Sequence, residues 1–246
     1  MKSYILVIDS GIGGVSVLNA LLKKFPQENF LYIADNLHAP FGERTKKDLT
    51  QIIIELIKHT LKKFKIKLII FACNTITATV IDEARKTFSI DFVGTEPNIK
   101  GLYDSGQNGI VLATTATIKN CKILNKYKTR KIKLVALKKV AKLLDENFCC
   151  REKVKIELKK QLKKYVGVTN VVLGCTHYNF LKKEISEILQ NNDIHFFSSV
   201  SGIVNRVETI IEDNSSQLNG EVIVLTTKKD ENFLNNLNKA LEKIET

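Results

Sequence analysis

The chain has 246 residues, of which 44% are hydrophobic, so it can bury the core of one large domain or two small ones. This composition excludes disorder as a description of the whole chain. The formal net charge of +12 raises the question of a nucleic-acid partner. Because the lysines are spread over amphipathic segments and no nucleic-acid-binding motif accompanies them, we expect solvated helix faces and no binding of nucleic acid.

The first strongly apolar segment, residues 4–8, ends at Asp9 and is too short for the apolar region of a signal peptide. No later run approaches the roughly 18 apolar residues that span a bilayer. We therefore expect a soluble cytoplasmic protein that does not interact with a membrane. The chain has five cysteines, an odd number without the spacing of a zinc site, so we expect free thiols and no metal.

Short β-branched runs alternate with longer helical patterns along the chain, which predicts an α/β fold with mainly parallel sheets. The expected strands are residues 4–8, 30–34, 68–72, 91–93, 109–113, 131–136, 170–173, 194–196 and 222–225. The expected helices lie at about 14–24, 46–64, 78–88, 119–126, 140–147, 153–164, 180–190, 202–212 and 230–243.

Two parts of this pattern resemble each other. Ala72-Cys73-Asn74-Thr75 and Gly174-Cys175-Thr176-His177 each follow a buried strand. We infer two pseudo-symmetric α/β lobes, each a mainly parallel sheet flanked by helices, with the active site in the cleft between them. The first lobe is expected to comprise residues 1–94 and about 204–246, because strand 222–225 is one more than the second lobe needs. The second lobe is then about 95–203.

Polar side chains gather where the predicted strands end, which is where open α/β sheets bind ligands. They include Asp9, Ser10, Asn74, Thr75, Thr114, Thr117 and Thr176. If the lobes face each other, Cys73 and Cys175 approach one cleft from opposite sides. A single cysteine at a strand end is more often a small buried apolar residue, but two in matched surroundings favour a shared chemical role.

Two opposed thiols are suited to inverting a stereocentre beside a carboxylate. That reaction needs a base on one face of the carbon and an acid on the other. Without a cofactor as an electron sink, the site must stabilise the carbanion with preorganised donors and exclude water. Asn74 and the threonines named above are suitable donors, Asp9 and Ser10 could receive a substrate ammonium group, and His177 is placed to assist Cys175.

The glycine run Gly11-Ile12-Gly13-Gly14 does not match a dinucleotide-binding motif, because Ser16 stands where the third glycine is required. We expect a tight turn from strand to helix that lets backbone amides approach an anion.

Taken in order, these motifs resemble the sequence blocks of bacterial glutamate racemases, in the aspartate/glutamate racemase superfamily. The blocks are Asp9-Ser10-Gly11-Ile12-Gly13-Gly14, Tyr32-Ile33-Ala34-Asp35, Pro40-Phe41-Gly42, Ala72-Cys73-Asn74-Thr75, Gly94-Thr95-Glu96-Pro97, Thr114-Thr115-Ala116-Thr117 and Leu173-Gly174-Cys175-Thr176-His177-Tyr178. The resemblance covers nearly the whole chain. It implies interconversion of L- and D-glutamate without pyridoxal phosphate or another cofactor, supplying D-glutamate for peptidoglycan, and it leaves a homodimer open.

The resemblance also assigns roles to individual residues. Cys73 would exchange a proton with one enantiomer and Cys175 with the other, assisted by Asp9 and His177. The substrate would be held by Asp9, Ser10, Phe41, Gly42, Asn74, Thr75, Thr114, Thr117, Thr176 and His177. Phe41 stands where the family usually has tyrosine, which leaves a backbone role, and Asn179 stands where it usually has proline.

In the stretch 135–146 the family usually has a Cys-Pro pair followed by an acidic residue near the second thiol, and this sequence has no Cys-Pro pair there. Asp145 is the best candidate for that acid, and Glu146 is the next.

Two alternatives remain at this point. One is an aspartate racemase or another two-cysteine isomerase of the same superfamily. The other is a basic nucleic-acid-binding protein whose racemase site has decayed.

Overall fold

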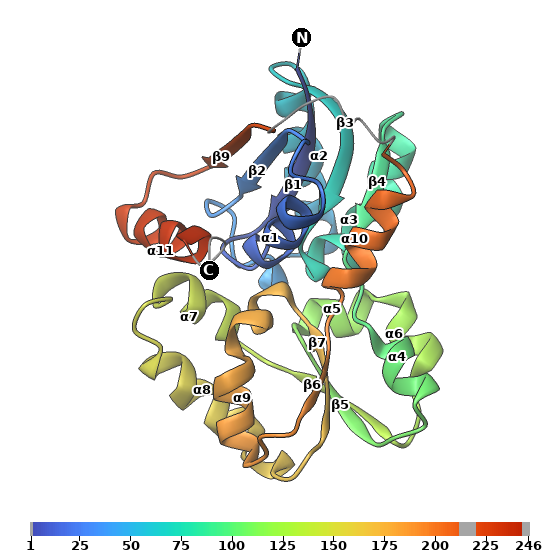
Figure 1. Cartoon of the computed structure of the whole chain (residues 1–246), viewed down its shortest axis with the longest axis vertical. Coiled ribbons are helices and arrows are strands. Elements are labelled where there is room, and N and C mark those ends of the chain that lie inside the picture. The colour runs from blue at the N-terminus through green and yellow to red at the C-terminus, as the bar shows by residue number, and fades with distance from the viewer. Residues whose placement is uncertain (1, 212–219, 243–246) are drawn as a thin grey trace.

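The computed structural model of the chain describes residues 2–211 and 220–242 and arranges their strands in two sheets, one above the other in Figure 1. The strand order is β4-β3-β1-β2-β9 in the first sheet and β6-β5-β7-β8 in the second. Neighbouring strands run parallel throughout. The predicted fold class, two α/β lobes with mainly parallel sheets, is confirmed.

The strands are β1 (Ser3–Asp9), β2 (Phe30–Ala34), β3 (Lys65–Phe71), β4 (Asp91–Gly94), β5 (Gly109–Ala113), β6 (Ile132–Ala136), β7 (Asn170–Gly174), β8 (His195–Phe197) and β9 (Val222–Thr226). The α-helices are α1 (Val15–Lys24), α2 (Lys46–Leu61), α3 (Asn74–Thr87), α4 (Ile99–Asp104), α5 (Thr115–Asn120), α6 (Lys122–Tyr127), α7 (Val140–Glu146), α8 (Glu152–Leu162), α9 (Lys182–Leu189), α10 (Val200–Glu208) and α11 (Glu231–Glu242). The short 3₁₀ helices of the described residues are η1 (Phe41–Glu43), η2 (Lys163–Tyr165) and η3 (Thr176–Leu181).

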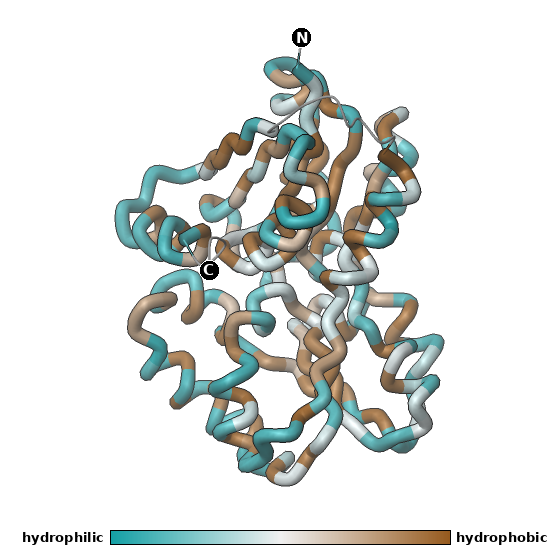
Figure 2. The backbone as a smooth tube through the Cα atoms, viewed as in Figure 1, coloured by the Kyte–Doolittle hydropathy of each residue, from teal (hydrophilic) through white to brown (hydrophobic). Residues whose placement is uncertain are grey.

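The central strands are uninterrupted apolar runs because both faces of each sheet are covered by helices. Figure 2 shows hydrophobic positions along the strands and hydrophilic ones on outer helices such as α11. The side chains of β1 alternate between two cores. Leu6 and Ile8 pack with Phe71 beneath α2 and α3. Val7 belongs to a core that continues into the second lobe and includes Leu173. The lobes therefore share apolar packing on one side.

The predicted strands agree with the observed ones to within about three residues, and the helices differ more. The helix expected from residue 78 begins at Asn74, directly after Cys73. Its first turn is buried but polar, so it gave no apolar periodicity. The helix expected at 119–126 is divided into α5 and α6 by the extended backbone of Cys121. Helix α4 was not predicted. The final residues expected for the last two helices, 212 and 243, lie outside the described residues.

After α10 the chain returns to the first sheet, where β9 pairs with β2 from Phe30↔Val222 onward. Helix α10 packs against α1 and β4, and α11 contacts both α1 and α7. The division into lobes at 1–94 with about 204–246, and about 95–203, stays a prediction, and residues 212–219 and 243–246 of it lie outside the described part. In that part, no helix is both long and apolar enough to cross a membrane.

Tyr32 ties β2 to the turn after β1, since its buried hydroxyl donates a hydrogen bond of 2.6 Å to the carbonyl of Gly11. We predict that Tyr32→Phe lowers the free energy of unfolding by about 1–3 kcal/mol, because it leaves that carbonyl without its donor. Urea denaturation measures the change. Tyr103→Phe, at a side chain 46% exposed, is the control and should be near neutral. Equal stability of the two variants would contradict the prediction.

Candidate active site

A cavity of about 410 Å³ lies where the carboxyl ends of the two sheets face each other, and Cys73 and Cys175 both line it. Cys73 follows β3 and Cys175 follows β7. The other residues predicted for the site that line it are Ser10, Phe41, Gly42, Thr75, Thr114 and His177. The structure therefore brings both thiols to one space, with one contributed by each lobe.

Cys73 is held at the start of α3, where its backbone is still extended and Asn74 begins the helix. Burial raises the pKa of its thiol, and the electrostatic interactions with Asp9 and Cys175 raise it further. Hydrogen bonds from the backbone amides of Ile76 and Thr75 oppose this shift. In the unliganded site, Cys73 therefore keeps its proton at neutral pH.

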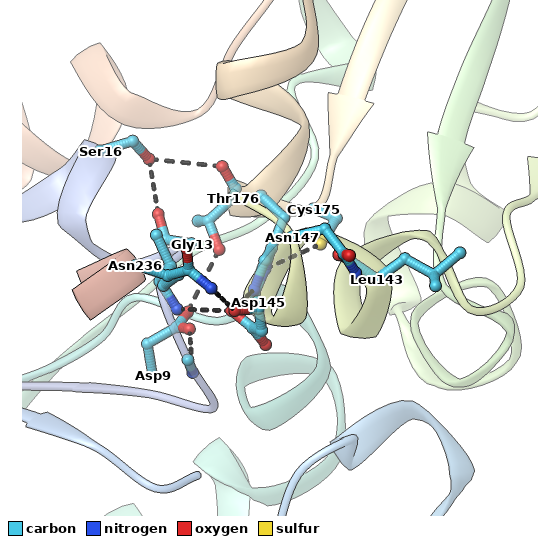
Figure 3. Close-up of polar contacts among 12 residues, drawn as sticks. Asp9, Gly13, Ser16, Leu143, Asp145, Asn147, Cys175, Thr176 and Asn236 are labelled. Carbon is cyan, nitrogen blue, oxygen red and sulfur yellow. Dashed lines mark hydrogen bonds and ion pairs between the residues drawn. The ribbon is translucent and has the colours of Figure 1, made fainter. Parts of the chain in front are cut away.

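Cys175 is connected to an acidic residue through a histidine. Its Sγ lies 3.7 Å from Nδ1 of His177, and Nε2 of the same ring lies 3.0 Å from Oδ1 of Asp145. These contacts run from Cys175 to Asp145 in Figure 3. Glu146 is the other acid considered from the sequence. Its Oε1 lies 3.9 Å from Nζ of Lys142 on the surface, and it takes no part in the contacts between Cys175, His177 and Asp145. A proton can pass between sulfur and the imidazole, whose orientation Asp145 fixes.

The charge of His177 is decided by its partners. Burial alone lowers the pKa of its imidazole, but the charge and hydrogen bond of Asp145, together with Cys175, outweigh burial and hold the pKa well above 6.5. His177 is therefore an imidazolium at neutral pH. The site contains a positive group beside one sulfur and a negative group, Asp9, beside the other.

The glycine turn after β1 contacts the second lobe beside Cys175. The amide of Ile12 donates a hydrogen bond of 2.8 Å to Asp145 Oδ1. A side chain at Gly11 would overlap the Asp145 carboxylate, and one at Gly13 would overlap His177 and Thr176. The amides of this turn do approach anions, as expected, but these anions are the protein's own carboxylates.

Asp9 is fully buried and accepts hydrogen bonds from the Gly11 amide at 2.8 Å and the Thr176 hydroxyl at 3.2 Å. Burial raises its pKa to about 6, while His177 and these donors oppose the rise. Asp9 is absent from the described lining of the cavity. It is therefore placed to influence Cys73 and Thr176 from behind the wall, and its contact with a substrate ammonium stays a prediction.

Three threonine hydroxyls join the lobes on the opposite wall. Thr75 Oγ1 lies 3.0 Å from Thr114 Oγ1 and 3.3 Å from Thr117 Oγ1, and Thr114 donates to Thr117 at 2.9 Å. Thr75 and Thr114 reach the cavity, whereas Thr117 is buried behind them. Asn74 donates to the Thr95 carbonyl at 3.1 Å, and its buried Oδ1 has no partner among the described residues.

Several lining residues were not singled out from the sequence. The most distinctive are Lys138, Lys139 and Lys142, between β6 and the middle of α7. In the sequence they are indistinguishable from the many lysines of solvent-facing helices. No local signal could have found them, because their position depends on how the second lobe faces the first.

Comparison with known proteins agrees with this geometry. No family model matches the chain. A glutamate racemase from Buchnera aphidicola subsp. Schizaphis graminum is 36% identical over 221 residues, covering 82% of this chain and 83% of the relative. The chain belongs to the glutamate racemase family. A glutamate racemase from Aliivibrio salmonicida is 34% identical over 98% of this chain and 94% of the relative.

The fold of this glutamate racemase family member agrees with a solved structure over nearly all of the chain. A glutamate racemase isoform from Bacillus anthracis superimposes with a TM-score of 0.83 at 25% identity, covering 98% of this chain and 94% of that one. The family resemblance drawn from the motifs is thereby confirmed, and the chain is an isomerase of the racemase type.

We predict that Asp145→Asn lowers the pKa of His177, because burial then acts on the imidazole without the opposing carboxylate charge. NMR titration of the imidazole measures this shift. In the wild type the raised pKa contributes stability that is fully present below pH 6.5 and is lost as pH rises through the folded-state value, so the variant should lose stability mainly at lower pH. Glu146→Gln is the control, and an unchanged His177 titration in Asp145→Asn would contradict the assignment.

Proposed function

We propose that this protein interconverts L- and D-glutamate by two-base proton transfer at Cα, with Cys73 and Cys175 on opposite faces of the substrate. The observation that carries the proposal is the position of the two cysteines, which come from different lobes and line one cavity. Membership of the glutamate racemase family supports glutamate as the substrate.

In one direction Cys175, as a thiolate, removes the Cα proton and becomes a thiol, leaving a planar carbanion. Cys73 then donates its proton to the opposite face and becomes a thiolate, so the product has the inverted configuration. In the other direction the two cysteines exchange roles. The raised pKa of Cys73 suits it to begin as the acid, and the His177–Asp145 pair beside Cys175 supports proton exchange there. Asp9, with its pKa of about 6, helps to restore the Cys73 proton.

The walls of the cavity supply the other requirements of the reaction. The hydroxyls of Thr75 and Thr114 and the amides at the start of α3 are donors for the α-carboxylate, where charge accumulates as the proton leaves. Ser10, which lines the cavity, is an acceptor for the ammonium group, and Asn74 supports the start of α3 through its hydrogen bond to the Thr95 carbonyl. Thr117 supports the Thr75 hydroxyl from behind, and Thr176 donates a hydrogen bond to Asp9. Phe41 and Gly42 line the cavity from the first lobe.

In the cell this activity would supply D-glutamate for peptidoglycan, in the cytoplasm and without a cofactor. We also propose that the protein assembles as a homodimer. Of the alternatives, a decayed site is disfavoured by the retention of both cysteines with the His177–Asp145 pair. Another isomerase of the superfamily is disfavoured by the identities with glutamate racemases.

We predict that Cys73→Ala and Cys175→Ala each reduce racemisation by at least about 100-fold, because each removes the acid/base group on one face. Circular dichroism of L- and of D-glutamate, without added cofactor, follows the reaction. Cys149→Ala and Cys150→Ala, at exposed thiols away from the cavity, are the matched controls and should retain wild-type rates. A cavity-cysteine variant that racemises at the wild-type rate would refute the two-thiol mechanism.

Substrate identity is tested separately, by exchange of the Cα hydrogen in deuterated solvent with glutamate and aspartate side by side. We expect exchange and inversion with both enantiomers of glutamate and much slower reaction with aspartate. Turnover of aspartate alone would favour the superfamily alternative. Exchange with neither substrate, combined with salt-dependent nucleic-acid binding, would favour the decayed site.

A further inference from the structure

The outer part of the cavity is positively charged. Lys138, Lys139 and Lys142 line it, and we call these three residues the cationic mouth. All three side chains are exposed, whereas both cysteines are only 6% exposed at the inner part. The cavity therefore has charged ammonium groups towards solvent and proton-transfer groups at its base.

Little negative charge in the described structure neutralises this mouth. No carboxylate of the described residues lies within 4.0 Å of the Lys138 or Lys139 ammonium, and Lys142 lies 3.9 Å from Glu146. Two carboxylates, Asp145 and Glu43, are among the described residues that line the cavity. Asp145 is paired with His177, so Glu43 on the first lobe and Glu146 outside the cavity are left to oppose three lysines. The resulting field attracts an anion.

The backbone that carries the mouth is held in place. The Lys138 amide donates to Gln161 Oε1 at 2.9 Å, and Gln161 Nε2 donates back to the Lys138 carbonyl at 3.0 Å. Lys139 has a left-handed backbone with φ of 61°, which a residue other than glycine adopts at a cost of about 1 kcal/mol. Such strain is concentrated at functional sites, because only the surrounding structure can maintain it.

Resting on the proposed function, we propose that the cationic mouth determines the preference of this enzyme for a substrate with a second carboxylate. The α-carboxylate is held at the base of the cavity beside the cysteines, and the lysines attract the distal carboxylate and stabilise it. A neutral amino acid gains nothing from this field, so the mouth discriminates by net charge before any proton is moved.

The test is a triple variant, Lys138→Gln, Lys139→Gln and Lys142→Gln, compared with a control triple of equal charge change, Lys153→Gln, Lys159→Gln and Lys163→Gln. The control lysines are exposed on α8 and η2 of the same lobe and lie outside the cavity. Glutamine suits position 139, since Gln190 has a similar φ of 54° in this protein. We expect kcat/KM for glutamate to fall about tenfold at low ionic strength in the mouth variant, through KM, with kcat unchanged.

The effect should diminish at about 0.15 M ionic strength, because salt screens exposed charges. A mouth variant that matches the control triple in KM and in salt dependence overturns the proposal. So does a variant that loses kcat at unchanged KM, which would give the lysines a role in positioning the catalytic groups.

Calorimetric binding of glutarate, an achiral dicarboxylate, separates this proposal from the proposed function. We expect glutarate to bind the wild type and the control triple equally and the mouth variant more weakly. Alanine, a zwitterion without net charge, should bind all three proteins with the same affinity. If the wild type fails to racemise glutamate but glutarate binding still depends on the three lysines, the proposed function is wrong and the role of the cationic mouth in binding dicarboxylates is upheld. Equal glutarate binding by all three proteins would refute the proposed role of the cationic mouth, even if the wild type racemises glutamate.

Discussion

The arrangement of the site depends on one contact, between the glycine turn after β1 and the Asp145–His177 pair of the second lobe. The turn lacks side chains where it meets this pair, so the Ile12 amide comes within 2.8 Å of Asp145 Oδ1. That bond orients the carboxylate, the carboxylate orients His177, and His177 meets Cys175. The surroundings of the second thiol are therefore completed by the first lobe.

The same contact concentrates buried charge. Asp9, Asp145 and His177 lie together between the lobes, where an isolated ion would be strongly destabilised. Pairing compensates: Asp145 charges the imidazole, and the imidazolium in turn favours the ionised form of Asp9. Removing one member would leave its partners buried and unsatisfied, so the cluster behaves as one electrostatic unit. The two cysteines lie in the field of this unit, and their protonation depends on how the lobes pack.

The cavity has a directional organisation. Donor hydroxyls and the two thiols are at its base, while exposed ammonium groups are at its opening. The base has the groups that a carbon acid beside a carboxylate requires, and the opening has charge that an amino acid with a neutral side chain would not use. This polarity agrees with the glutamate racemase family to which the chain belongs.

The sequence by itself determined the α/β class, the positions of most strands and the two cysteines at strand ends, because these depend on local periodicity and on short motifs. It also favoured Asp145 over Glu146 without deciding between them. Only the tertiary structure decided that Asp9 lies behind the wall, that Asp145 is bonded to both the glycine turn and His177, and that three ordinary lysines line the cavity. Those facts depend on how separate segments of the chain meet in space. Ile12 and Asp145 are 133 positions apart and Asp145 and His177 are 32 apart, and such contacts leave no periodic trace in the sequence.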